Sequence, residues 1–254
     1  MAIANRHRIR SLALALLTPA LLALAFLVPT GASAASYNFI RPDVLVPPGI
    51  AIFGPASIYP SSVEVSGLEG TVSKATVTFL GVSSGSADDI DALLVGPDGQ
   101  QVMLMSDACG EGALVSRAFL TFDDDATSML PDKGPCPSNQ AASFRPSNFV
   151  GNSPEPDQFG AGGGIAPPYG NSLAVFDGTS PNGPWDLFAR DDNESTLGLE
   201  ISGWMLTLDV QPPPAPPAPP ALTGKRARAL AKCKKKKTSK ARKRCRANAR
   251  KLPR

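Results

Sequence analysis

The chain has 254 residues, with 25 lysines and arginines, 22 aspartates and glutamates and one histidine, His7. His7 lies in a leader that we expect to be removed, so the processed chain has no imidazole. This excludes Ser-His-Asp and Cys-His nucleophile systems and histidine-ligated zinc or copper sites. The net charge of +3 combines segments of opposite charge. Residues 35–224 hold all 22 acidic residues and six basic ones, a formal charge of −16, while residues 225–254 hold sixteen basic residues and no acid.

The first segment, residues 1–34, is typical of a secretory signal peptide. Three arginines precede an apolar run over residues 12–28, and small residues with an A-x-A site end at Ala34. An uncleaved membrane anchor is the alternative, but the run is slightly short for a span of about 20 residues, and Pro19 interrupts it. We therefore expect cleavage, a secreted protein associated with the cell surface, and no transmembrane segment after processing.

The second segment, residues 35–211, reads as one domain of short strands. Alternating patterns and short apolar runs predict strands at residues 73–81, 90–95, 102–105, 118–122, 173–176, 184–190 and 202–210. Gly- and Pro-rich turns such as GPDG separate them. Trp185 and Trp204 fall on alternating apolar faces, which favours core packing over a sugar-binding platform. Residues 132–170 are polar and rich in Pro and Gly and predict a surface loop. These features predict an all-β, antiparallel jelly-roll β-sandwich.

Four cysteines in an exported chain predict two disulfides, Cys109–Cys136 and Cys233–Cys245. A four-cysteine zinc site is the alternative, but neither pair has C-x-x-C spacing. Twelve residues of unbroken helix would separate the second pair by about 18 Å, and a disulfide needs about 4.4–6.8 Å between Cα atoms. The tail therefore folds back near Thr238, or it pairs between molecules. We prefer a small helical hairpin closed by its own disulfide.

A proline-rich linker, residues 212–224, precedes a basic tail, residues 225–254. The linker favours polyproline II and acts as a stiff spacer of roughly 30 Å. Sixteen basic charges predict attachment of Lys225–Arg254 to anionic cell-wall or surface polymers. A nucleic-acid partner is an alternative, although the tail has no aromatic residue for base stacking. A purely solubilising extension is another.

Six body segments resemble, in the family's order, the P domain (P/Homo B domain) of proprotein convertases. They are residues 58–82, 88–110, 119–126, 144–148, 173–192 and 198–208. Within them, Asn182, Gly183 and Trp185 match the family's N-G-x-W bend. Ser83-Ser84 stand where convertase domains often carry a histidine, and no subtilase catalytic domain precedes the segments. The resemblance implies a jelly roll of galactose-binding-like type that stabilises a subtilisin-like serine protease.

Bacterial relatives of this family often bind calcium, so the resemblance also implies a metal site. Hard cations prefer carboxylate and carbonyl oxygens, and aspartates gather at the ends of the predicted strands. The candidate ligands are Asp88, Asp89, Asp91, Asp123, Asp124, Asp125, Asp191 and Asp192. No EF-hand spacing is present, and the alternative is that these clusters only solvate loops.

Together these features predict a secreted, non-catalytic, calcium-supported P-domain-like module. We expect it to bind or assist an extracellular partner, such as a separately encoded subtilisin-like protease. A serine-endopeptidase-family protein or fragment is the first alternative, and a polyanion or nucleic-acid binder driven by the tail is the second. Carboxylate pairs are too common in this chain to indicate a glycosidase.

Overall fold

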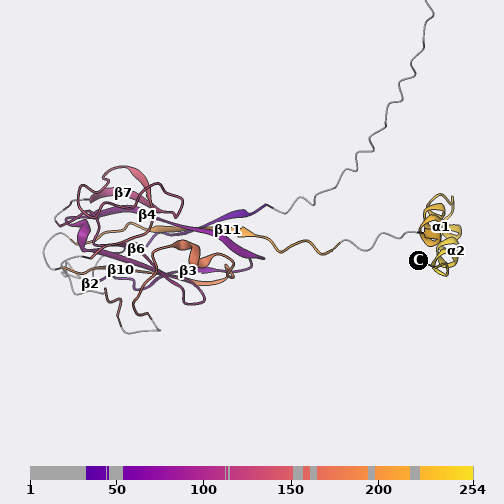
Figure 1. Ribbon diagram of the computed structural model, residues 1–254, viewed down its shortest axis with the longest axis horizontal. Helices are drawn as coiled ribbons and strands as arrows, with labels where there is room; N and C mark the ends of the chain where they lie inside the picture. The colour runs from indigo at the N-terminus through magenta and orange to yellow at the C-terminus, as the bar shows by residue number, and fades with distance from the viewer. Residues whose placement is uncertain are drawn as a thin grey trace, which may run out of the picture. The chain divides into compact units, whose positions relative to one another are not determined.

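Eleven β-strands among the described residues form two sheets (Figure 1), and the main core contains side chains from both. The computed structural model describes residues 33–43, 45, 54–111, 113, 115–150, 157–160, 165–193, 198–217 and 224–253. The predicted leader up to residue 32 lies outside these ranges. None of the helices in the described ranges has the length and apolarity needed to cross a bilayer.

One sheet has five strands in the order β1–β11–β4–β7–β8. Their bounds are β1 (Ala35–Arg41), β4 (Thr71–Ser84), β7 (Val115–Phe122), β8 (Ala141–Phe144) and β11 (Trp204–Gln211). In β11 the buried side chains alternate with partly exposed ones, as the period-two pattern predicts. The strand is antiparallel to both of its neighbours.

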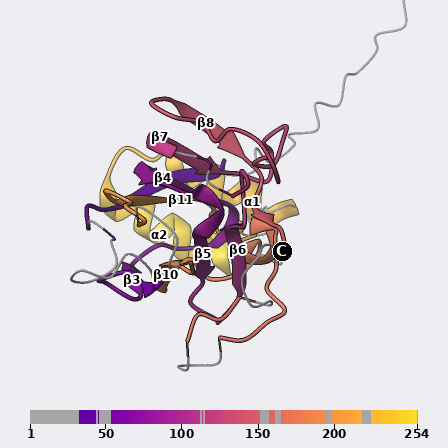
Figure 2. The same ribbon diagram turned by 90° about the vertical axis from the view of Figure 1, so that its left-hand side faces the viewer.

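The other sheet has six strands in the order β2–β10–β5–β6–β9, with β3 also paired to β10. Their bounds are β2 (Gly54–Pro55), β3 (Ser61–Val65), β5 (Ile90–Val95), β6 (Gln101–Ser106), β9 (Ser147–Asn148) and β10 (Gly183–Asp191). Figure 2 shows β4, β7 and β11 in one layer and β5, β6 and β10 in the other. The prediction of two packed sheets is therefore confirmed, while the jelly-roll connectivity stays a prediction.

Two pairings are parallel, β7 with β8 and β6 with β9, so both sheets are mixed. The prediction of an antiparallel sandwich was therefore wrong for these edge strands. Both β8 and β9 lie in residues 132–170, which were expected to be a surface loop. Phe159 in the same stretch is buried as well. Short pairings at a sheet edge leave little trace in a polar sequence, because few of their side chains enter the core.

The two tryptophans lie in the core, as predicted, and each indole has a hydrogen-bond acceptor. Trp204 donates from Nε1 to Ser61 Oγ at 2.9 Å, and Trp185 donates to the Pro181 carbonyl at 3.0 Å. Both side chains are fully buried. A buried indole N–H without an acceptor would be costly, so these bonds fix the orientation of each ring.

The Asn-Gly-x-Trp bend has a clear structural basis. Asn182 binds the backbone of Leu68 twice: its Oδ1 accepts from the N–H at 3.0 Å and its Nδ2 donates to the carbonyl at 2.8 Å. Gly183 has φ +126°, and a Cβ there would lie 2.9 Å from Pro97. Only glycine fits both conditions.

Residues 173–176 form a 3₁₀ turn, η2 (Leu173–Phe176). The prediction of a strand there was wrong. Ser172 caps the turn by accepting from the N–H of Ala174. Leu173 and Phe176 are nevertheless buried, so the apolar run does serve the core. A short apolar run has the same appearance in either conformation.

The basic tail forms two helices, α1 (Gly224–Lys234) and α2 (Ser239–Arg250), joined by the Cys233–Cys245 disulfide. The predicted hairpin is confirmed. The Cα atoms of the two cysteines lie 5.5 Å apart, and Thr238 accepts from the N–H of Ala241 as the N-cap of α2. Cys109 and Cys136 form the second predicted disulfide.

Candidate metal centre

Three adjacent strands of the six-stranded sheet carry acidic residues at the same edge. Asp191 ends β10 and pairs with Ile90 at the start of β5, while Asp91 pairs with Arg190, so the two acids lie one pair apart on neighbouring strands. β6 runs antiparallel to β5 and ends at Ser106, directly before Asp107. The strand order therefore brings the strand ends that carry these acids close together.

Asp91, Asp157 and Asp192 form the centre of this group. One carboxylate oxygen from each lies within 4.8 Å of the others. The Asp91 side chain is fully buried, and neither of its oxygens has a hydrogen-bond donor among the described residues. A buried carboxylate without a donor or counterion is strongly unfavourable. Arg190 lowers the pKa of Asp91 less than burial and the neighbouring acids raise it, so a proton or a bound cation would stabilise this carboxylate.

Residues 157–160 and 165–169, which we call the cover segment, bring Asp157 over the sheet. Tyr169 donates from its hydroxyl to the Asp157 carbonyl at 2.9 Å, and Tyr59 donates to the Phe159 carbonyl at 2.6 Å. Phe159 and Tyr169 pack edge to face with ring centroids 5.5 Å apart. These contacts fix the backbone that carries Asp157.

The segment covers the outer face of the sheet. Leu93 belongs to an apolar cluster separate from the main core. The cluster consists of Leu93, Met103, Phe159 and Phe188, with Tyr59, Val95, Ile165 and Tyr169 packed against it. Because alternate residues of a strand share a face, Asp91 lies on the same covered face as Leu93. Burial under the cover segment thus explains why the Asp91 carboxylate is completely buried although it lies near the end of its strand.

The electrostatics of the group disfavour negative charge. Burial raises the pKa of Asp91 well above its ordinary value, and the nearby carboxylates of Asp157, Asp192 and Asp107 raise it further. Burial also raises the pKa of Asp191 to about 7, with added repulsion from Asp89 and Asp192. A bound cation would reverse this tendency, because it favours the ionised carboxylates.

Ser106 connects two of these carboxylates. Its Oγ lies 2.7 Å from Asp157 Oδ2 and 2.9 Å from Asp107 Oδ2. A hydroxyl has one proton, so it cannot donate fully to both acids at once.

The donor set fits a hard divalent cation. Calcium takes oxygen ligands at about 2.3–2.6 Å, so two oxygens on one ion lie at most about 5 Å apart. The spacing within 4.8 Å satisfies this condition. Carboxylates without sulfur or imidazole favour calcium or magnesium over zinc or copper. Asp91, Asp157 and Asp192 are the residues that would hold such an ion.

Three other predicted ligands lie around this centre. Asp89 accepts from Asn193 Nδ2 at 3.4 Å, and Asp191 accepts from the Asn193 N–H at 3.3 Å. The N–H of Asp192 donates to the Asp89 carbonyl at 3.1 Å. Asp88 is half buried, and burial together with Asp89 raises its pKa. These contacts hold the end of β10 against the start of β5.

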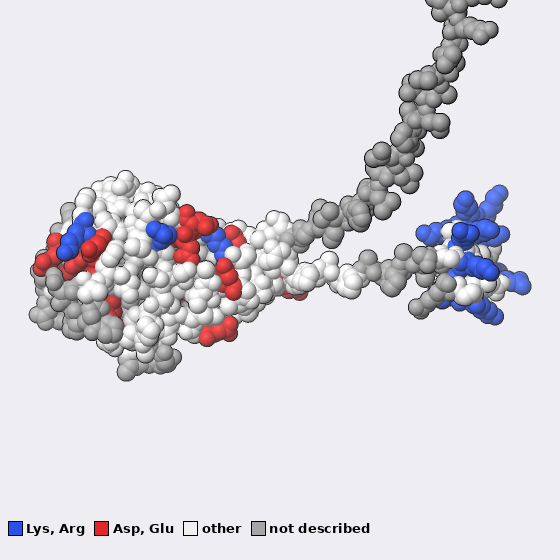
Figure 3. Space-filling model, in the orientation of Figure 1, with Lys and Arg blue, Asp and Glu red and all other residues white. Residues whose placement is uncertain are grey.

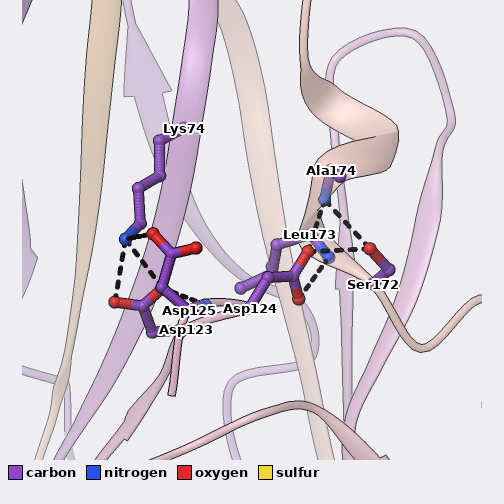
Figure 4. A network of polar contacts seen from close by, with 7 residues as sticks. All are labelled: Lys74, Asp123, Asp124, Asp125, Ser172, Leu173 and Ala174. Carbon is purple, nitrogen blue, oxygen red and sulfur yellow. Dashed lines mark hydrogen bonds and ion pairs between the residues drawn. The ribbon is translucent and has the colours of Figure 1, made fainter. Parts of the chain in front are cut away.

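Asp123, Asp124 and Asp125 lie in a different network, shown in Figure 4. Lys74 Nζ lies 2.8 Å from Asp123 Oδ1 and 2.6 Å from Asp125 Oδ2. Asp124 accepts from the N–H groups of η2 and from Ser172 Oγ at 2.7 Å. These acids follow β7 in the five-stranded sheet and have protein partners of their own.

The two acidic groups lie at opposite ends of β4. Lys74 is near its start, whereas η1 (Ala87–Asp89), which leads to Asp91, follows its end at Ser84. Ten strand residues separate Lys74 from Ser84, a distance of about 33 Å at 3.3 Å per residue. The eight predicted ligands therefore do not meet at one site.

The sequence reasoning missed Asp157 and Asp107. Asp107 directly follows β6, so the same pattern of acids at strand ends would have found it. Asp157 lies in a stretch without strand periodicity, and no local signal places it over β5.

No family model matches the chain, and no curated relative does. Two solved structures are similar to it: a serine protease of Aeromonas sobria, with 12% identity and a TM-score of 0.31, and the same protease in complex with its chaperone, with 14% identity and a TM-score of 0.33. The similar region covers 68% and 70% of this chain but spans only 27% and 28% of those chains. Likeness at this level carries no argument about activity.

Proposed function

We propose that the β-sandwich is a non-catalytic binding module whose native state is stabilised by one Ca²⁺ ion. Asp91, Asp157 and Asp192 hold the ion. The observation that supports this most directly is the fully buried Asp91 carboxylate, whose oxygens have no donor among the described residues. An ion bound there joins the cover segment, through Asp157, to β5 and to the end of β10.

The proposed role of the ion is structural. Anything that binds the folded state and not the unfolded one stabilises the fold, by about 2.7 kcal/mol when its concentration is a hundred times its dissociation constant. Because Asp157 belongs to the cover segment, the cation also keeps Phe159 seated on the outer face of the sheet.

The test is thermal unfolding of the full chain in calcium and in chelator. We expect the melting temperature to rise by several degrees with calcium in the wild type. Asp125→Asn is the matched control, because Asp125 is an exposed acid that pairs with Lys74, and its calcium shift should equal that of the wild type. An identical melting temperature with and without calcium in the wild type would overturn the proposal.

The partner that we propose for the module is a separately encoded subtilisin-like serine protease. The support is the order of six sequence segments that resemble the P domain, together with the lack of histidine after residue 34. The protein should slow thermal inactivation of such a protease and should not itself react with a serine-directed probe. Covalent labelling of the chain would instead favour the endopeptidase reading.

A further inference from the structure

The helical hairpin presents one continuous cationic face on α2. The face consists of Ser239, Arg242, Lys243, Arg246, Ala247 and Arg250, which line an open groove of about 540 Å³. These residues follow the spacing i, i+3, i+4, i+7, i+8 and i+11, so they share one side of the helix. All six are exposed. We call this surface the α2 face.

No acidic residue balances this charge within the hairpin. Residues 224–253 contain no Asp or Glu, and Figure 3 shows lysine and arginine side chains over much of its visible surface. Arg242, Arg246 and Arg250 stand four residues apart, a spacing at which like charges destabilise a helix. The structure therefore holds together charges that would separate in a free chain.

The Cys233–Cys245 disulfide holds these charges together. The buried residues of the two helices are only Cys233 and Ala249. Such a small apolar core contributes little stability, whereas a disulfide that closes a loop of this size contributes about 3 kcal/mol. The disulfide thus fixes the positively charged side chains of the hairpin in one folded arrangement.

The side chains of the α2 face are suited to binding phosphate. Three of its four cations are arginines, whose planar forks bind phosphate oxygens in pairs. Along the helix axis these arginines repeat at about 6 Å, four residues at 1.5 Å each. A row of forks at regular spacing suits a linear polymer with repeated phosphates better than a single ion.

Two other partners fit less well. A helix that enters a membrane surface needs bulky apolar residues opposite its charges, and α2 contains only alanine and cysteine as apolar residues. Binding to single-stranded nucleic acid relies on aromatic stacking, and residues 224–253 contain no aromatic residue.

We propose that the α2 face binds a linear phosphodiester polymer of the cell envelope, of the poly(glycerol phosphate) type. The disulfide agrees with this location, because such bonds persist in oxidising compartments. This inference rests on the tail and is independent of the cation site in the sandwich.

The test measures binding of the full chain to purified poly(glycerol phosphate) at several salt concentrations. The variant Arg242→Gln/Arg246→Gln/Arg250→Gln should bind at least about tenfold more weakly, with a salt dependence of log K smaller by about 2–3. The matched control, Lys235→Gln/Lys236→Gln/Lys237→Gln, removes the same charge from the turn between the helices and should stay within about threefold of the wild type. Equal losses in both variants would mean diffuse attraction without a defined face, and would overturn the proposal.

Further arms separate the other outcomes. Arg→Lys replacement at the same three positions keeps the charge and removes the forks, so it should retain part of the affinity. Circular dichroism confirms that each variant keeps its helices. Tighter binding to duplex DNA or to anionic lipid vesicles than to the polyol phosphate would overturn the choice of partner. Unchanged polymer binding after the disulfide is reduced and the helices are lost would overturn the role of the folded face.

Discussion

Asp91 and Arg190 lie directly opposite each other on the neighbouring strands β5 and β10, and the charge of Arg190 lowers the pKa of Asp91, although burial and the neighbouring carboxylates raise it more. The guanidinium donates from Nη1 to the carbonyl of Gln158 in the cover segment. The Asp91 oxygens meanwhile have no donor in the described part of the chain. The strand pairing thus places a cation next to Asp91 while its hydrogen bond goes to Gln158, so the Asp91 oxygens stay available to the proposed ion.

Replacing Asp91 with Asn should have opposite effects in the two metal states. Without metal, the change removes a buried charge that lacks a partner, and we expect stability to rise by roughly 1–3 kcal/mol at pH 8. With calcium, the variant should lose most of the stabilisation seen in the wild type. Chemical denaturation in chelator and in calcium measures both effects. A variant that keeps the full calcium shift would contradict the role of Asp91.

Replacing Asp124 with Ala should weaken the fold without touching the calcium response. Asp124 accepts from the N–H groups of Leu173 and Ala174, so its loss resembles the loss of a helix cap, a cost of about 1–2 kcal/mol. The comparison of melting temperatures with and without calcium is the measurement. A reduced calcium shift would place Asp124 in the metal site and contradict the separation of the two acidic groups.

The metal-free protein should lose stability as the pH rises from about 4 to about 7. Burial raises the pKa of Asp191 from 3.8 to about 7, so the folded state holds this proton more tightly than the unfolded chain does. Such a group favours folding fully at pH values below 3.8, and its contribution disappears as the pH passes through the folded-state pKa. Melting temperatures in chelator across this range test the sign.

Calcium should reduce or reverse that decline, because a cation at Asp91, Asp157 and Asp192 favours the ionised form of the nearby Asp191 carboxylate. Asp191→Asn is the matched variant and should flatten the metal-free profile. A metal-free melting temperature that climbs steadily between pH 4 and pH 7 would show that other groups dominate.

Reduction of Cys233–Cys245 should unfold the two tail helices. The charges of α2 repel one another, and few side chains of the hairpin are buried. Far-ultraviolet circular dichroism of a Cys233→Ser/Cys245→Ser variant should show loss of the helical signal. The control, Cys109→Ser/Cys136→Ser, should keep that signal even if the sandwich becomes less stable. Helices that persist in the first variant would contradict this account.

The strands that could be predicted are those with a long alternating pattern or a buried apolar run. β11 and β5 have the bounds that their sequences indicate to within a residue or two. β8, by contrast, alternates only between exposed and half-buried residues, so its sequence lacks the contrast that marks a strand. The N–H groups of η2 donate to Asp124, about fifty residues away, a contact that the local sequence does not show.

The residues of the candidate site also divide into those that the sequence could indicate and those that it could not. Asp91 and Asp192 could be proposed from their places at strand ends, since neighbouring antiparallel strands bring such ends together. Asp157 could not, because its position depends on the path of a long segment whose contacts with Tyr169 are not local. Asp123 could not be separated from Asp91 and Asp192 in advance, because the sequence does not show which end of a sandwich a strand end occupies.

The step from β8 to β9 has a consequence for how the molecule comes apart. Only Arg145 and Pro146 separate these strands, yet β8 is bound to β7 in one sheet and β9 to β6 in the other. The nearby disulfide joins Cys109, which follows β6, to Cys136, which precedes β8. Separating the two layers would therefore require β8 to leave β7 or β9 to leave β6, so probes placed in either layer should report the same denaturation midpoint.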